Sequence, residues 1–120
     1  MYNLFLDDIR YPRMVFNYIN DTDYNKLSWV IVRSYDEFIN YIKINKIPNL
    51  ISFDHDISDE HYSPTNTHYE KTGYDALKWL CDYSLYNNLP LPKIKFHTAN
   101  PIGKKNMITY LNNFQKHNKK

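Results

Sequence analysis

Acidic and imidazole side chains follow three short apolar runs in this chain of 120 residues. If these runs are parallel strands of one sheet, their carboxyl ends meet at the same edge, where open α/β folds bind ligands. Carboxylates gathered at such an edge repel one another unless a cation or a proton neutralises them. The pattern therefore predicts a site that handles metal ions or phosphate groups. The residues concerned are Asp7 and Asp8 after the first run, Asp54, His55 and Asp56 after the second, and His97 after the third.

The carboxylates offer hard oxygen ligands, which suit Mg²⁺ or Mn²⁺. A bound cation would hold a substrate phosphate and spread the charge that develops on its oxygens. In the alternative interpretation, some of these acids cap loops or pair with Arg10 or Lys95. This alternative is strongest for Asp8, because adjacent side chains of a strand point to opposite faces. We expect four metal ligands: Asp7, Asp8, Asp54 and Asp56.

Four strands and three helices are expected to position these groups. Apolar and β-branched runs predict strands at residues 3–7, 29–32, 50–54 and 93–98. Helices are predicted after the S-x-x-E capping box at Ser34, from Gly73, and after the Asn100-Pro101 pair. Residues 13–27 are left unassigned. Residues 55–72 form a polar stretch that contains His61 and His68 as solvated residues, and a loop of this length is often functional.

Strands that alternate with helices predict an α/β fold with a parallel sheet. Short right-handed crossovers favour the strand order 2-1-3-4, in which the first and third strands are central neighbours. The acidic ends of these two strands should then lie side by side.

Size and composition narrow the classes of function. The chain suits one domain, residues 1–120, with a single core. A formal net charge of only +2 argues against a dedicated binder of double-stranded DNA. The single cysteine, Cys81, allows no intrachain disulfide and fits a reducing compartment. No apolar run approaches a membrane span and no signal peptide is visible, so we expect a cytoplasmic protein without membrane partners.

Four blocks of the sequence, in this order, resemble the pattern of cyclic-phosphate processing receiver-like domains: residues 6–12, 53–56, 72–80 and 97–107. This group diverges from response-regulator receivers by an Asp-His-Asp run, here at residues 54–56, and by a histidine before the threonine, here His97. The receiver's fifth strand, with its lysine, is also missing here. The resemblance implies a receiver-like, flavodoxin-like three-layer sandwich. It further implies action on a cyclic phosphate, with a cyclic nucleotide or a cyclic-phosphate-ended RNA as partner.

Opening a cyclic phosphate requires activation of a water and protonation of the leaving ribose oxygen. Imidazole titrates near neutral pH, so His55 and His97 can divide these two tasks beside Asp54. Two other interpretations stay open for the histidines: ligands of a softer metal such as Zn²⁺, or hydrogen-bonding residues of the core.

Basic and polar residues near the predicted edge are candidates for holding the phosphate. Arg10 can bind a phosphate bidentately, or it can hold an acid in place. Thr98 offers a hydroxyl donor, and Asn100 begins a helix whose N-terminus can seat an anion besides being capped. The remaining candidates are Gly103, which would let backbone approach a phosphate, and the adjacent Lys104 and Lys105.

The leading hypothesis is a metal-assisted phosphodiesterase or related phosphoryl-processing enzyme acting on a cyclic phosphate. One alternative is a signalling receiver that is phosphorylated on Asp54. Another is a non-catalytic sponge that sequesters a cyclic nucleotide.

Overall fold

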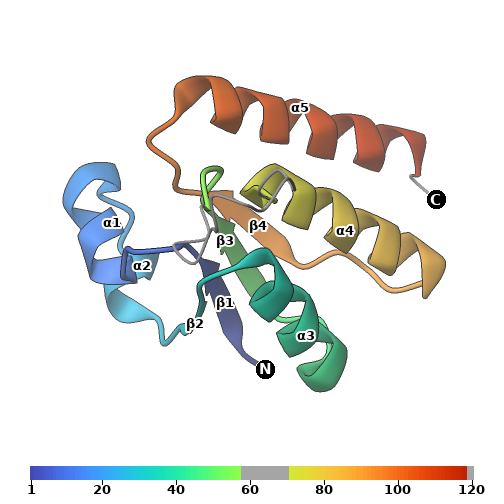
Figure 1. Cartoon of the computed structure of the whole chain (residues 1–120), viewed down its shortest axis with the longest axis horizontal. Helices are drawn as coiled ribbons and strands as arrows, with labels where there is room; N and C mark the ends of the chain where they lie inside the picture. The colour runs from blue at the N-terminus through green and yellow to red at the C-terminus, as the bar shows by residue number, and fades with distance from the viewer. Residues whose placement is uncertain (58–70, 119–120) are drawn as a thin grey trace, which may run out of the picture.

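The computed structural model describes residues 1–57 and 71–118. Four parallel strands form one sheet in the order β2-β1-β3-β4, which confirms the predicted order. Helices cover both faces of this sheet (Figure 1). The elements are β1 Asn3–Leu6, α1 Pro12–Ile19, α2 Asp23–Lys26, β2 Val30–Val32, α3 Tyr35–Asn45, β3 Leu50–Phe53, α4 Gly73–Tyr86, β4 Lys93–Phe96 and α5 Pro101–His117.

One face of the sheet carries the larger part of the core. Leu4, Leu6, Ile51 and Phe53 of the two central strands are buried there against α3, α4 and α5. Because side chains alternate along a strand, the residues between them point to the opposite face. On that opposite face, Phe5 packs in a smaller cluster against α1 and α2. Helices therefore enclose the two central strands from both sides, as a parallel sheet requires.

Side-chain caps begin the longer helices where the sequence predicted them. The hydroxyl of Ser34 accepts a hydrogen bond from the backbone N–H of Glu37 at the start of α3. The side chain of Asn100 accepts one from the N–H of Gly103 at the start of α5. These bonds satisfy amide groups that have no partner within the helix.

The segment left unassigned, residues 13–27, forms the two short helices α1 and α2. Pro12 occupies the first turn of α1, where its missing N–H costs nothing. Val15 is buried against Phe5, and Asn20 ends α1 in the left-handed conformation that asparagine tolerates well. Packing against the sheet thus stabilises α1 as a helix, although the local sequence did not predict one.

The predicted strands extend one or two residues beyond the observed ones. The strand predicted at residues 3–7 ends at Leu6, and those predicted at 50–54 and 93–98 end at Phe53 and Phe96. The chain turns at these points, although the next backbone amides still join the sheet. Residues 58–70 of the predicted polar loop, with His61 and His68, lie outside the described residues. No helix among the described residues is long and apolar enough to cross a membrane.

Candidate functional site

Parallel hydrogen bonding continues one residue past three strands and aligns the candidate site. The N–H of Asp7 donates to Val32 on β2 over 3.2 Å, and the N–H of Asp54 donates to Leu6 on β1 over 3.0 Å. The N–H of His97 donates to Phe53 on β3 over 2.9 Å. Strand register therefore places Asp7, Asp54 and His97 at the same height along the carboxyl edge.

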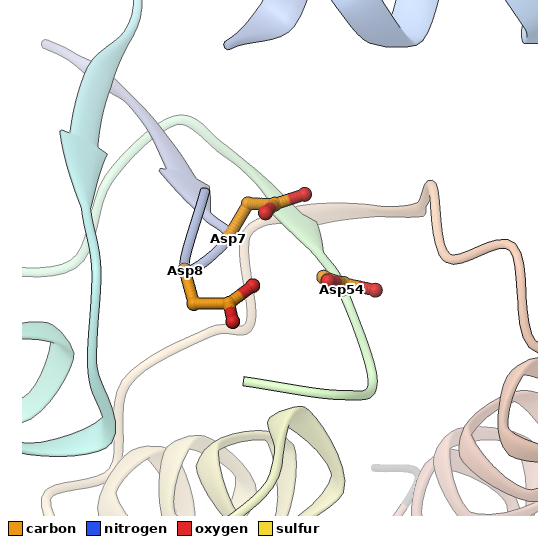
Figure 2. Close-up of side chains that lie close together, drawn as sticks. All are labelled: Asp7, Asp8 and Asp54. Atoms are coloured by element: carbon orange, nitrogen blue, oxygen red, sulfur yellow. The ribbon is translucent and has the colours of Figure 1, made fainter. Parts of the chain in front are cut away.

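Three of the predicted acidic ligands gather at this edge. A carboxylate oxygen from each of Asp7, Asp8 and Asp54 lies within 4.8 Å of the others. Figure 2 shows Asp7 and Asp8 after β1 and Asp54 after β3 on the neighbouring strand. The irregular turn after β1 lets Asp8 join Asp7, although the two residues are adjacent in sequence. The fourth predicted ligand, Asp56, is not part of this cluster among the described residues.

The carboxylate of Asp7 is completely buried but well supplied with hydrogen-bond donors. Its Oδ1 accepts from the backbone N–H groups of Ile9, over 3.0 Å, and Arg10, over 2.8 Å. Its Oδ2 lies 3.1 Å from Nε2 of His97. Burial by itself raises the pKa of Asp7, but the bonds from His97 and from these two amides outweigh it and lower the pKa to about 2. The carboxylate of Asp7 is therefore charged at neutral pH.

Asp54 is nearly as buried as Asp7, at 3% exposure, but its pKa is shifted in the opposite direction. Burial and the negative charge of Asp7 raise the pKa of Asp54, while a hydrogen bond with the Thr98 side chain and one from the N–H of His55 lower it. The negative charges of Asp7 and Asp54 thus repel each other. Any cation placed between them would relieve this repulsion.

Two arginines organise the turn after β1. Nη1 of Arg10 lies 3.7 Å from Oδ2 of both Asp7 and Asp54, so its charge partly neutralises the pair. Nη1 of Arg33 donates to the carbonyl oxygens of Asp7, over 3.1 Å, and Arg10, over 2.6 Å. The backbone of this turn is therefore held by Arg33, while the side chain of Arg10 faces the acids.

His97 lies at the centre of a buried hydrogen-bond chain. Its ring is fully buried and stacks on Phe5 with 4.4 Å between the ring centroids. Its Nε2 lies 3.1 Å from Oδ2 of Asp7, and its Nδ1 lies 2.6 Å from the hydroxyl of Ser52. The Ser52 hydroxyl also shares a hydrogen bond of 2.6 Å with the hydroxyl of Tyr24. Both nitrogens of His97 are thus engaged by protein groups.

Unlike His97, His55 is not fully buried: 18% of its side-chain surface is exposed. Its Nδ1 lies 2.8 Å from Oδ1 of Asp56, and the other carboxylate oxygen of Asp56 accepts from the amide of Asn100 over 3.3 Å. Asp56 therefore holds His55 and the cap of α5 together. This use of its oxygens explains why Asp56 does not join the acid cluster.

The other predicted phosphate-binding residues lie in different surroundings. Thr98 is buried beside Asp54 and also accepts from the N–H of Asn100 over 3.1 Å. Lys104 and Lys105 are exposed on the first turns of α5. A side chain at Gly103 would meet the ring of His55, with a Cβ atom only 2.5 Å from Cγ. Gly103 therefore leaves room for the imidazole of His55.

Two site residues were missed in the sequence. Arg33 follows β2 directly, so the rule that identified Asp7 after β1 would have found it too. Tyr18 lies on α1, in the unassigned segment, and its hydroxyl donates to the backbone oxygen of His97 over 2.8 Å. No sequence pattern marks Tyr18, because only the packing of α1 brings it to this edge.

The buried chain predicts a measurable loss of stability in Ser52→Ala. Removal of this hydroxyl leaves Nδ1 of His97 and the hydroxyl of Tyr24 without their partner. We expect the free energy of unfolding to fall by about 1–3 kcal/mol in urea denaturation. Tyr24→Phe should cost less, because Ser52 and His97 keep their hydrogen bond to each other. An equal loss in both variants would contradict the central place of Ser52 in this chain.

Comparison with known proteins agrees with this architecture. The model of the family described as cyclic-phosphate processing receiver domain matches residues 2–113. No curated protein and no solved structure matches the chain. The match spans all four strands and the three acids at their carboxyl edge. The chain therefore belongs to the family of cyclic-phosphate processing receiver domains.

Proposed function

We propose that the protein is a metal-assisted phosphodiesterase that hydrolyses a cyclic phosphate of a nucleotide or of an RNA end. The observation that carries this proposal is the cluster of Asp7, Asp8 and Asp54, with its oxygens within 4.8 Å and Arg10 beside it. Family membership supports a cyclic phosphate as the substrate group.

The three carboxylates fit a hard divalent cation, Mg²⁺ or Mn²⁺. They offer oxygen ligands, two of them buried, and the low pKa of Asp7 keeps at least one fully charged. The cation would supply Lewis acidity toward a phosphoryl oxygen. Asp7, Asp8 and Asp54 would hold it.

The chain's own groups account for the remaining steps of hydrolysis. The guanidinium of Arg10, 29% exposed, can bind a phosphate oxygen while it stays near the acids. A water oxygen forms a new bond to phosphorus as the bond from phosphorus to one ribose oxygen breaks. His55 is the partly exposed imidazole of the site and can take the proton of the attacking water, while the leaving ribose oxygen takes a proton from solvent. The product is a linear phosphomonoester.

His97 is assigned a different role from the proton transfer expected from the sequence. It is fully buried, and Asp7 and Ser52 occupy its two ring nitrogens. Such a histidine orients a carboxylate ligand from behind. We therefore infer that His97 positions Asp7 and that only His55 exchanges protons with substrate.

Activity is tested with a panel of 2′,3′-cyclic nucleotides, cyclic dinucleotides and RNAs that end in a cyclic phosphate, each with Mg²⁺ or Mn²⁺. We expect a linear phosphomonoester from at least one of them, and Asp54→Asn should abolish its formation. Tight binding without product in every metal would instead support a sponge. A phosphoaspartate at Asp54 after treatment with acetyl phosphate, detected by mass spectrometry, would support a signalling receiver.

Metal binding makes a separate prediction about thermal stability. A cation that binds only the folded state raises the melting temperature, by an amount equivalent to about 2.7 kcal/mol at 100 times its dissociation constant. We expect Mg²⁺ or Mn²⁺ to raise the melting temperature of the wild type. The double variant Asp7→Asn/Asp54→Asn should lose this response, whereas Asp82→Asn, an exposed change on α4, should keep it. No response in the wild type would argue against the metal.

A further inference from the structure

Tyr18 combines an exposed ring with a fixed position. Its exposed fraction is 46%, which is large for an aromatic side chain. Its hydroxyl is nevertheless anchored, because it donates to the backbone oxygen of His97 over 2.8 Å. The ring is thus held at one end by the backbone of His97, directly after β4, and at the other by α1. A ring held in this way loses little freedom when a ligand packs on it.

The ring lies beside the acid cluster. The guanidinium carbon of Arg10 is 5.8 Å from the centroid of the Tyr18 ring, in cation–π geometry. The charges of Arg10, Asp7 and Asp54 all influence the Tyr18 hydroxyl, although burial has the largest effect on its raised pKa. An anchored aromatic surface therefore borders the side chain that would bind the phosphate.

We propose that Tyr18 forms a stacking surface for the base of the substrate, so that the site selects nucleotides over cyclic phosphates that carry no base. This inference rests on the proposed function and names the substrate class more narrowly. A phosphate held by Arg10 leaves the attached nucleoside next to Tyr18, and bases of any identity can stack on a tyrosine ring. Selectivity would then depend on the presence of a base and little on which base it is.

The test compares adenosine 2′,3′-cyclic phosphate with glycerol 1,2-cyclic phosphate, which carries the same strained ring without a base. The quantity measured is kcat/KM with Mg²⁺ or Mn²⁺, or the dissociation constant by calorimetry if an ester binds without turnover. We expect the adenosine ester to be favoured by about tenfold or more. Tyr18→Leu should remove most of this preference.

Two control variants separate stacking from a structural role. Tyr18→Phe keeps the ring and loses only the bond to His97, so it should retain most of the preference. Tyr86→Leu alters a tyrosine that is 93% exposed at the far end of α4, and it should match the wild type.

Each other outcome overturns the inference. Equal use of both esters by the wild type would refute the stacking surface and leave the proposed function in place. So would a loss in Tyr18→Leu that is the same for both esters, or a preference that Tyr18→Phe abolishes as well. Failure to bind or cleave any cyclic phosphate would refute the inference together with the proposed function.

Discussion

Gly73→Ala is expected to be strongly destabilising, by about 3 kcal/mol or more, although alanine is the better helix former. Helix propensity alone predicts a gain of about 1 kcal/mol from this change at a helical position. A Cβ atom at Gly73, however, would lie 1.6 Å from the carbonyl oxygen of Asp54 and 2.7 Å from its carbonyl carbon. Both are backbone atoms, so relief of the clash requires that α4 or the turn after β3 move.

The chain's other glycine supplies the matched control for this prediction. A Cβ atom at Gly103 would meet ring atoms of His55 at 2.5–2.9 Å, and a side chain can rotate where backbone cannot. Gly103→Ala should therefore cost less stability and mainly displace His55. Urea denaturation of both variants measures the difference. If both variants lost the same free energy of unfolding, or if Gly73→Ala gained stability, α4 would not pack closely against the backbone of Asp54.

His55→Ala is expected to lower kcat for the cyclic phosphate by on the order of 10²–10⁴-fold while substrate binding largely survives. Loss of one group that transfers protons in the transition state has this magnitude. The change removes the partly exposed imidazole but leaves Arg10 and the three acids in place. Steady-state kinetics should therefore show the loss in kcat, with little change in KM.

His97→Ala should give a different pattern, because it removes the hydrogen-bond partner of Oδ2 of Asp7 and of the Ser52 hydroxyl. We expect a loss of stability and of metal affinity as well as of rate. The control is His117→Ala, which changes an exposed residue in the last turn of α5. Its stability, metal affinity and kcat should equal those of the wild type. Full turnover by His55→Ala would leave the acids and the cation as the whole catalyst. If His97→Ala lowered kcat but left stability and metal affinity unchanged, His97 would transfer protons, and its assignment as a residue that positions Asp7 would be wrong.

The sequence by itself was enough to predict the sheet and the edge at which the acids gather. Short apolar runs that are each followed by charged or polar groups indicate parallel strands whether or not the helices between them are known. Strand order followed from crossover rules, and that order makes β1 and β3 neighbours. The meeting of Asp7 with Asp54 is therefore a consequence of topology, which local sequence patterns encode well.

Tertiary structure decided which side chains are partly exposed beside the acids and which are buried and hold the acids in place by hydrogen bonds. The burial of His97 depends on which face of the sheet its side chain takes directly after β4 and on the packing of Phe5 and Tyr24 around it. The use of Asp56 by His55 depends on where α5 begins. Tyr18 reaches the site only because α1 packs on the sheet. These placements arise from contacts between residues distant in sequence, and the patterns within single segments do not contain them.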